Sequence, residues 1–450
     1  MIQDFETFDC PASRSPVSRS QTEYNMIDTI YQHFQKAYKV STDSRKIEKD
    51  AVFFALKGDN FDANDFALQV AKEGKASLVV ADRKDLPQHE RILIVDDTLK
   101  TLQHLAAYHR QQSKATVLSI TGTNGKTTTK ELVSAVLAKK FNLIHTMGNL
   151  NNHIGVPLTL LSIQPDTEMA VVEMGANHPG EIDFLCKIAD PDYGLITNIG
   201  KAHLEGFGNF EGVIKTKTEL YRHIKAHGKA VFVNQGNPLL WEQSEGQERI
   251  TYGRHCAADA PVAPGQCDPY LSVVWRKHLI QTHLVGSYNF ENVAAAIGVG
   301  QYFGVDENDI IEALEAYTPT NSRSQVIETP KNRIIMDAYN ANPTSMRAAL
   351  VNFANICGEH HLLILGDMRQ LGTASEEEHR NILGLMKELR YKDALLVGPN
   401  FSAFNDNAAW KSFQKVEELY QYVETHPIEG KRILVKGSRG IQLEKILPLL

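Results

Sequence analysis

Cysteine is scarce in this sequence, and its spacing does not suit a disulfide framework or a zinc site. The 450 residues contain five cysteines and no C-x-x-C pair; the cysteines are Cys10, Cys186, Cys256, Cys267 and Cys357. An odd number of unpaired thiols favours reduced cysteines in the cytosol.

Long apolar runs are also missing. No run approaches the roughly 20 residues that a membrane helix needs. The segment from Met1 to Asn25 is polar and lacks the apolar core of a signal peptide. We therefore expect a cytoplasmic protein without membrane insertion.

Positive charge is not in excess. The formal net charge is -7, from 54 acidic and 47 basic residues, and no block of Lys and Arg stands out. This balance disfavours nucleic acid as a partner. A polyanionic ligand must therefore be held by a local site.

The composition, 42% hydrophobic and 22% charged, is that of a globular protein too long for one hydrophobic core. Strands alternate with helices along most of the chain, which predicts an α/β fold. We place domain boundaries so that residues 1–25 form a disordered tail, 26–96 a small α/β domain, 97–321 a central domain, and 322–450 a third α/β domain.

Apolar strands mark each domain. The central ones are apolar throughout and separated by helices, which indicates a parallel sheet covered on both faces. Residues 98–113 are predicted to form a connecting helix, residues 255–270 an irregular loop, and Ser375–Glu378 the capping box of a helix. The predicted strands are Val52–Leu56, Ser77–Ala81, Thr116–Ile120, Met169–Val172, Gly194–Thr197, Ala230–Val233, Arg333–Met336, His361–Leu365, Ala394–Val397 and Arg432–Val435.

The strongest motif is Thr121–Thr128, TGTNGKTT, between an apolar strand and an amphipathic helix. This context is typical of a phosphate-binding loop, whose backbone N–H groups and helix N-terminus face phosphate oxygens. Lys126 is predicted to hold the β- and γ-phosphates, and Thr127 to bind magnesium. Ile120 stands where the usual motif has its first glycine, and a plain strand-to-helix turn is the alternative.

Other polar residues follow predicted strands, where a parallel sheet binds its ligands. Glu173 ends one such strand and is a candidate magnesium ligand or a capping residue. His203 follows another, although a lone histidine is more often structural. Gly148–Pro157 offers three asparagines to a polar ligand or is a turn-rich connector, and Lys436–Gly440 is a second anion-binding turn or a helix cap.

Together these motifs resemble the Mur ligase family, over the chain from about residue 41 to its end. The segments that carry the resemblance occur in the family's order: Thr121–Thr127, Gly148–Pro157, Glu173–Glu181, Asp337–Pro343, Leu365–Met368 and Val435–Gly440. Their order is similar to that of the member which adds a D-alanyl-D-alanine dipeptide to UDP-N-acetylmuramoyl-tripeptide.

The resemblance implies a central P-loop parallel-sheet ATPase, flanked by a UDP-binding α/β domain and a Rossmann-like C-terminal domain. It implies an ATP-dependent amide ligase of peptidoglycan precursor synthesis, with an acyl-phosphate intermediate. Its substrates would be ATP, UDP-N-acetylmuramoyl-tripeptide and D-alanyl-D-alanine, and we expect a monomer.

The resemblance also assigns site residues. Lys126, His203 and Lys217 are implied to be catalytic. Two magnesium ions are implied, held by Thr127, Glu173, His203 and a carbamylated Lys217. The implied ATP-binding residues are Gly122, Thr123, Asn124, Gly125, Lys126, Thr127, Thr128, Asn289, Asn292, Arg323, Asp337 and Tyr339. The implied UDP-substrate residues are Ser44, Arg45, Lys57, Gly58, Asn149, Asn151 and Asn152.

The sequence departs from the family pattern at a few positions. Tyr288 stands where a histidine is usual, and Ala63-Asn64 where Gly-His is common. The Asp-Asn-Pro-Arg string of the ligase that adds the third stem residue is absent from the sequence, which favours the dipeptide-adding reaction. A folylpolyglutamate synthase-like ligase and a nucleotide-binding regulator that no longer ligates are the alternatives.

Overall fold

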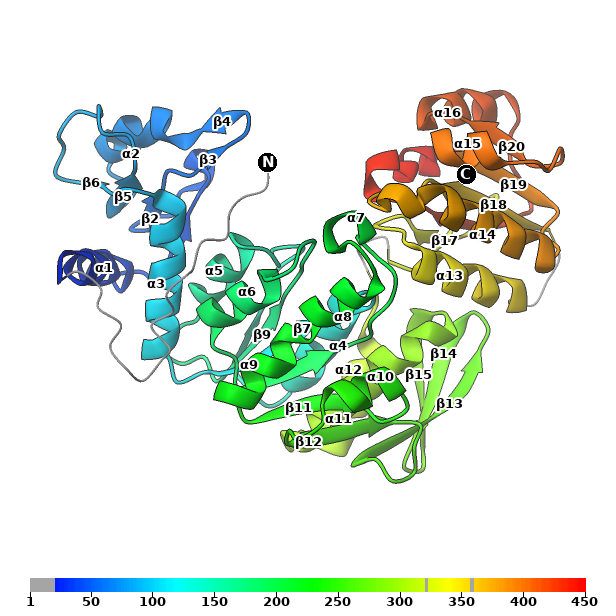
Figure 1. Cartoon of the computed structure of the whole chain (residues 1–450), viewed down its shortest axis with the longest axis horizontal. Coiled ribbons are helices and arrows are strands. Elements are labelled where there is room, and N and C mark those ends of the chain that lie inside the picture. The colour runs from blue at the N-terminus through cyan, green and yellow to red at the C-terminus, as the bar shows by residue number, and fades with distance from the viewer. Residues whose placement is uncertain (1–20, 320–322, 357–359) are drawn as a thin grey trace.

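The computed structural model describes residues 21–319, 323–356 and 360–450, which form three domains built on separate sheets (Figure 1). In Figure 1 the small N-terminal domain and the C-terminal domain lie at the upper left and upper right, with the central domain beneath and between them. The predicted α/β fold is confirmed. Among the helices of the described residues, none combines the length and apolar character needed to cross a membrane.

The N-terminal domain is a four-stranded parallel sheet in the order β1-β2-β5-β6. Its strands are β1 (Val40–Ser41), β2 (Val52–Phe54), β5 (Leu78–Ala81) and β6 (Ile92–Ile94), with a small hairpin of β3 (Lys57–Gly58) and β4 (Phe61–Asp62). Its helices are α1 (Gln21–Phe34), η1 (Ser44–Lys46), η2 (Ala63–Phe66) and α2 (Ala67–Glu73), and α3 (Thr98–Gln112) leads to the central domain.

Helix α1 corrects the predicted tail. The helix already begins at Gln21, so residues 21–25 are helical and not part of a disordered tail. Its apolar residues Ile27, Ile30 and Phe34 are buried in the same cluster as Leu102 and Leu105 of α3, which explains why the helix forms at this end of the chain. The rest of the predicted tail, residues 1–20, lies outside the described residues.

The central domain is a nine-stranded sheet in the order β15-β14-β13-β12-β11-β10-β7-β9-β8. Neighbours from β8 to β13 are parallel, as predicted for this region, and β13, β14 and β15 are antiparallel. The strands are β7 (Thr116–Thr121), β8 (Leu143–His145), β9 (Met169–Glu173), β10 (Tyr193–Ile196), β11 (Ala230–Asn234), β12 (Arg249–Gly253), β13 (Ala260–Cys267), β14 (Tyr270–Trp275) and β15 (His278–Val285).

Strand β13 contradicts the irregular loop predicted for residues 255–270. Its prolines and glycine resemble a loop in sequence, but Ala260 and Val262 are buried and the strand pairs with β14 from Val262 to Cys267. The register shifts between Pro264 and Cys267, which accommodates residues that a regular strand would exclude.

Helices cover both faces of the central sheet. One buried cluster joins the sheet to α5 and α6, and another joins it to α4, α11 and α12. The helices are α4 (Lys126–Leu137), α5 (Gly155–Leu160), α6 (Glu181–Ala189), α7 (Leu204–Phe207), α8 (Phe210–Lys217), α9 (Glu219–His227), α10 (Pro238–Gln243), η3 (Ser287–Asn289), α11 (Phe290–Tyr302) and α12 (Glu307–Ala316).

The C-terminal domain has a six-stranded sheet in the order β16-β17-β21-β18-β19-β20, parallel except for β16. Its strands are β16 (Gln325–Glu328), β17 (Arg333–Asp337), β18 (His361–Gly366), β19 (Asp393–Val397), β20 (Lys411–Phe413) and β21 (Arg432–Lys436). Its helices are α13 (Pro343–Asn355), η4 (Gly372–Ala374), α14 (Ser375–Glu388), α15 (Pro399–Phe404), α16 (Val416–Thr425), η5 (Arg439–Ile441) and η6 (Leu443–Leu449).

The capping box predicted at Ser375–Glu378 is wrong. The 3-10 turn η4 runs directly into α14, so Ala374 occupies the N-cap position and makes no side-chain cap bond. Ser375 is already inside the helix, where its hydroxyl lies 3.3 Å from Oδ1 of Asn400.

Candidate active site

A cavity of about 900 Å³ lies between the central and C-terminal domains. The loop before α4, the end of β9, the start of α11 and the segment after β17 all contribute to its walls. A smaller cavity of about 520 Å³ shares Thr127, Arg323, Tyr339 and Asn340 with the first. All the predicted ATP-binding residues except Gly122 line the larger cavity, so the structure brings together residues from Thr123 to Tyr339.

The phosphate loop has the backbone that its glycines permit. Gly122 and Gly125 have φ of 143° and 77°, and Gly125 caps α4. A Cβ at Gly125 would lie 2.5 Å from Oδ1 of Asn292, so no larger residue fits there without a shift. Lys126 Nζ donates to the carbonyl oxygens of Gly122 at 2.9 Å and Thr123 at 3.2 Å. Burial lowers the pKa of Lys126.

Glu173 is held at the end of β9 by two side chains. Thr127 Oγ1 donates to Glu173 Oε2 and Asn151 Nδ2 donates to Oε1, each at 2.8 Å. Glu173 is buried, with 1% of its surface exposed. A hydroxyl and a carboxylate that already meet beside a phosphate loop match the hard oxygen donors that magnesium prefers.

His203 lies on the same wall. Its Nδ1 is buried without a hydrogen-bond partner among the described residues, and its φ is 50°. Burial, followed by the charges of Lys126 and Lys217, lowers the pKa of His203 to about 4. The imidazole is therefore neutral near pH 7, the form that can coordinate a metal.

These residues fit a magnesium ion whose remaining ligands would be phosphate oxygens of ATP and water. Across residues 21–319, 323–356 and 360–450, no three His, Cys, Asp or Glu side chains gather into a ready metal centre. Magnesium does not need one, because it is usually bound by one or two protein groups together with phosphates and water. Thr127, Glu173 and His203 offer that smaller set.

Lys217 ends α8 and lies behind the cavity wall. It is 2% exposed, and its Nζ lies 5.6 Å from the centroid of the Phe207 ring. Burial and the charge of Lys126 lower the pKa of Lys217 to about 7, against the opposing influence of Glu181, Glu219 and Glu173. Lys217 is not among the residues that line either cavity.

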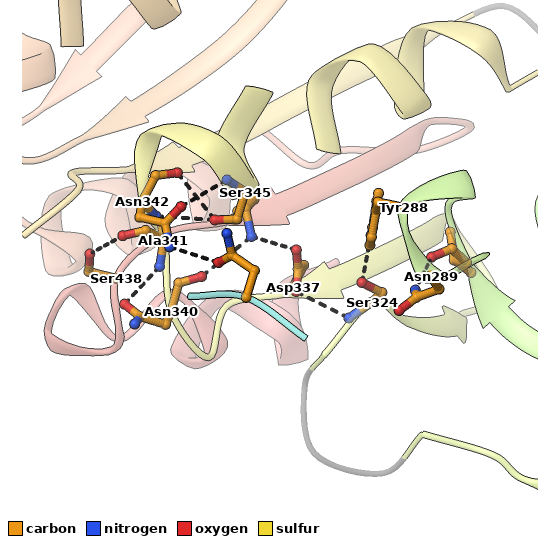
Figure 2. Close-up of polar contacts among 12 residues, drawn as sticks. Tyr288, Asn289, Ser324, Asp337, Asn340, Ala341, Asn342, Ser345 and Ser438 are labelled. Atoms are coloured by element: carbon orange, nitrogen blue, oxygen red, sulfur yellow. Dashed lines mark hydrogen bonds and ion pairs between the residues drawn. The ribbon is translucent and has the colours of Figure 1, made fainter. Parts of the chain in front are cut away.

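Asn289 and Asn292, which the family resemblance implies to bind ATP, are bonded to each other. Asn292 Nδ2 donates to Asn289 Oδ1 at 2.8 Å, and Asn292 Oδ1 accepts from Thr129 Oγ1 at 3.0 Å. The preceding Tyr288, where a histidine is usual, shares a hydrogen bond of 2.6 Å with Ser324 Oγ (Figure 2). Tyr288 therefore ties η3, the turn that leads into α11, to the start of the C-terminal domain.

The C-terminal wall is built around Asp337 (Figure 2). Asp337 Oδ1 accepts from the Ser324 backbone N at 3.2 Å, and Oδ2 lies 2.5 Å from Lys436 Nζ. Arg323 lies over the Tyr339 ring, 3.8 Å from its centroid, and its Nε is buried without a partner among the described residues. A guanidinium with a free N–H beside a phosphate loop is suited to bind phosphate.

Four of the predicted UDP-substrate residues, Ser44, Arg45, Lys57 and Gly58, do not line either cavity. Ser44 and Arg45 form η1, where Arg45 makes a two-pronged contact with Asp43, and Lys57 and Gly58 form the exposed β3. In contrast, Asn151 and Asn152 line the larger cavity and Asn149 the smaller one. The predicted UDP-substrate residues therefore divide between the N-terminal domain and the cavity.

Sequence reasoning gave no individual role to several residues of the site, although Arg439 lies in the segment Lys436–Gly440 that was predicted to be an anion-binding turn or a helix cap. Asn198 Oδ1 accepts from the backbone N of Asn124 at 3.0 Å, and Asn342 Nδ2 donates to Asn124 Oδ1 at 2.7 Å across the domain boundary. Arg369 and Arg439 line the smaller cavity. Asn342 and Arg439 lie in family motifs, but nothing in their spacing indicates which atoms they meet.

Family models describe most of this architecture. Residues 120–300 match the Mur ligase middle domain, and residues 322–439 match the Mur ligase, glutamate ligase domain. The fold and the site therefore define a three-domain nucleotide-dependent ligase.

Individual relatives narrow this class. A UDP-N-acetylmuramoyl-tripeptide–D-alanyl-D-alanine ligase of Bacillus subtilis is 36% identical over 423 residues, which cover 91% of this chain and 92% of the relative. A crystal structure of MurF from Acinetobacter baumannii has a TM-score of 0.81 and 31% identity, over 93% of this chain and 97% of its own. MurF ligase from Thermotoga maritima in complex with ADP has a TM-score of 0.79 and 27% identity, covering 91% and 96%. The chain belongs to the Mur ligase family, in the branch of the UDP-N-acetylmuramoyl-tripeptide–D-alanyl-D-alanine ligases.

Proposed function

We propose that this protein uses ATP to join D-alanyl-D-alanine to UDP-N-acetylmuramoyl-tripeptide, a step in making peptidoglycan precursors. The observation that carries the proposal is the single cavity that holds Lys126, Glu173 and Arg323 from two domains. A relative that is named for this reaction and is 36% identical across 91% of the chain supports it.

The reaction needs a leaving group on the terminal carboxylate of the tripeptide. A carboxylate oxygen attacks the γ-phosphorus of ATP, the bond to the bridging β–γ oxygen breaks, and ADP leaves. The amine of D-alanyl-D-alanine then attacks the acyl-phosphate carbon, the C–N bond forms, and the C–O bond breaks to release phosphate. The amine loses a proton to solvent in the process.

Lys126 and Arg323 have distinct tasks in this scheme. Lys126 exchanges its bonds to the Gly122 and Thr123 carbonyls for the β- and γ-phosphates, and Arg323 approaches from the C-terminal domain. Thr127, Glu173 and His203 would hold a magnesium ion, which would supply positive charge to neutralise the phosphates. Positioning and charge stabilisation supply most of the catalysis of phosphoryl transfer.

We propose that a carbamate on Lys217 would hold a second magnesium. Carbamylation requires a neutral amine, and a pKa of about 7 makes that form abundant near neutral pH. The neutral amine attacks the carbon of dissolved CO₂, the N–C bond forms as one C=O π bond breaks, and the nitrogen loses a proton to solvent. The product carries an anionic oxygen donor where the protonated lysine would carry a buried positive charge. Glu181 and Glu219 lie close enough to influence the Lys217 charge, and Glu219 accepts backbone N–H bonds from Gly180 and Asp183.

The smaller cavity suits the carboxylate of the incoming dipeptide. Arg323, Arg369 and Arg439 line it, and no Asp or Glu does so among the described residues. Arginine binds carboxylates through paired hydrogen bonds. We propose that Arg369 and Arg439 hold the dipeptide's terminal carboxylate, which leaves its amine free to approach Thr127 and the phosphates.

The remaining assignments concern the nucleotide-linked substrate and the cell. We propose that Ser44, Arg45, Lys57 and Gly58 bind the UDP moiety, and that the asparagines of residues 149–152 guide the peptide toward the cavity. The free thiols of Cys186, Cys256 and Cys267 support a cytoplasmic location. A monomer is sufficient, because one chain supplies both walls of the cavity.

Two measurements on the purified enzyme test the function. Phosphate release from ATP should require both UDP-N-acetylmuramoyl-tripeptide and D-alanyl-D-alanine, and mass spectrometry should find the pentapeptide product. Offering L-alanine or glutamate as the amine is the control, and neither should give product at a comparable rate. Phosphate release that needs no amine, or product formed from glutamate, would move the chain to a regulator or a folylpolyglutamate synthase-like ligase.

A further inference from the structure

A second lysine of α4 is almost completely buried, and the proposed function gives it no role. Lys130 lies one turn after Lys126 and exposes 1% of its surface. Its Nζ donates to the Thr146 carbonyl oxygen at 2.6 Å and lies 2.5 Å from Glu131 Oε1. Burying a charged ammonium costs several kcal/mol unless its partners offset the loss of water, on the order of the known penalties for buried ions. No phosphate-binding role accounts for this lysine, because it does not line either cavity.

Thr146 connects Lys130 to the metal side of the site. It directly follows β8 and is fully buried. Its backbone N donates to the Val171 carbonyl at 3.0 Å, and its Oγ1 accepts from the backbone N of Glu173 at 2.9 Å. Thr146 therefore extends the pairing of β8 with β9 by one residue. Its hydroxyl accepts the last of these hydrogen bonds, from the backbone N–H of Glu173.

The same helix holds Glu173 by two routes. Thr127 Oγ1 bonds directly to the Glu173 carboxylate, and Lys130, three residues later and on the same face of α4, bonds to the residue that holds the Glu173 backbone. The carboxylate and the backbone of Glu173 are therefore fixed separately. A side chain fixed at both ends loses little freedom when a metal binds, which favours binding.

We infer that Lys130 is a positioning residue that acts through Thr146 to fix Glu173 for magnesium. The inference rests on the proposed function, because it takes Glu173 as a ligand of the ATP-bound metal. It assigns Lys130 no contact with ATP or with either peptide. Loss of the Lys130–Thr146–Glu173 path should weaken metal binding and leave dipeptide recognition unchanged.

The decisive variant is Thr146→Val in the full-length protein. Valine keeps the branched shape and the backbone carbonyl that Lys130 needs, but it removes the hydroxyl that accepts from Glu173. We expect the dissociation constant of Mn²⁺ from the protein–ADP complex, measured by electron paramagnetic resonance, to rise by about 10- to 100-fold, as for other residues that orient metal ligands. The magnesium concentration needed for half-maximal ligation should rise in parallel, with an unchanged KM for D-alanyl-D-alanine.

Matched variants separate positioning from general stability. Thr146→Ser retains the hydroxyl and should bind Mn²⁺ like the wild type. Lys130→Met should weaken Mn²⁺ binding at least as much as Thr146→Val. The control is Lys139→Met: Lys139 follows α4, is exposed and pairs with Glu312, and its substitution should leave Mn²⁺ binding unchanged. If Lys130→Met does not fold, Thr146→Val still tests the path, because an unchanged Mn²⁺ affinity in that variant would remove the link between Lys130 and Glu173.

The inference and the proposed function fail in different ways. A wild-type enzyme that makes no pentapeptide would remove the proposed function. A wild type that ligates, together with a folded Thr146→Val variant whose Mn²⁺ affinity is unchanged, would overturn the role of Lys130. That role is also overturned if Thr146→Val lowers the melting temperature but leaves the magnesium requirement as it was.

Discussion

The proposed nucleotide side and the proposed peptide side of this protein are built differently. On the nucleotide side, Thr127 and Glu173 are buried, Asn151 and Lys126 are half-buried, and all four are already bonded to one another or to the loop. On the peptide side, Arg369 and Arg439 are exposed. The guanidinium of Arg45, in the N-terminal domain, donates hydrogen bonds to Asp43. On the proposed assignments, the phosphates would therefore meet a preorganised site, whereas the peptides would meet side chains that still have to assemble.

The largest effect should come from the preorganised side. Lys126→Ala removes the cation nearest the transferring phosphoryl group, and we expect ligation to fall by about 1000-fold or more. The melting temperature should change little, because the lysine bonds only to loop carbonyls. Steady-state kinetics and calorimetry check this, and a folded variant with near-normal turnover would show that the loop does not bind ATP.

Substitution of Lys217 tests whether a buried residue that does not line the cavity also belongs to the nucleotide side. Lys217→Ala should be nearly inactive, with activity lost by about 100-fold or more if it removes a ligand of the metal set. Acetate or formate should restore part of the rate by supplying the missing carboxylate oxygens. Lys215→Ala, two residues earlier on α8, is the control and should be close to wild type. Equal behaviour of the two variants would contradict the carbamate.

Arg439 tests the peptide side. In the wild type, replacing D-alanyl-D-alanine by its C-terminal amide should lower kcat/KM by about 10- to 100-fold, the value of a charged hydrogen bond. In Arg439→Met, most of that discrimination should disappear because the arginine that reads the carboxylate is gone. Arg380→Met, on the exposed face of α14, should discriminate like the wild type. An amide penalty that survives in Arg439→Met would place the carboxylate elsewhere.

The unmodified Lys217 also predicts how stability depends on pH. Burial lowers its pKa to about 7 in the folded protein, whereas a free lysine has a pKa of about 10.4. Between these values the unfolded chain binds the extra proton, so this lysine destabilises the fold most at pH 7 and below, and progressively less toward pH 10.

Lys217→Met removes that penalty. In buffer free of CO₂ and nucleotide, the variant should melt a few degrees above the wild type at pH 7. The difference should shrink as the pH approaches about 10. Thermal melts across this range provide the measurement, and a difference that is constant or increases with pH would show that Lys217 is not the titrating group.

The smallest effect is expected at the contact between the two sides. Asn342 caps α13 and donates from Nδ2 to Asn124 of the phosphate loop. Asn342→Ala should cost about 1 kcal/mol for the lost cap, and should raise the KM for ATP by about 2- to 10-fold for the lost hydrogen bond. Asn342→Asp keeps an acceptor for the cap but not the donor, so it should retain stability and lose only ATP affinity. An unchanged KM in both variants would show that the domain contact does not support the loop.

The sequence predicts local features of this fold well. Thr121–Thr128 follows an apolar strand and precedes an amphipathic helix, and the structure has β7 and α4 there. Strand β13 was missed because pairing with β14, and not its own composition, makes it a strand. The capping box failed because η4 precedes α14 and displaces Ser375 from the cap.

Contacts between distant segments explain what could not be predicted in the site. Asn124 and Asn342 are separated by 218 residues, and Asp337 and Lys436 by 99. No periodicity links such pairs, because only the relative placement of two domains or of two strands brings them together. The position of Lys130 beside Thr146 likewise depends on how β8 lies against α4, which helix periodicity alone cannot reveal.

The buried cluster that joins α1 to α3 changes what a domain boundary near residue 97 means. Ile27 and Phe34 share that cluster with Leu102, Leu160 and Leu185 of the central domain, so the boundary divides the sheets but not the hydrophobic core. The first two domains should consequently melt as one cooperative block. The C-terminal sheet, with two clusters made almost entirely of its own residues, forms a separate block that can open while the rest stays folded. On heating, the C-terminal domain should therefore separate from the central domain at the cavity between them.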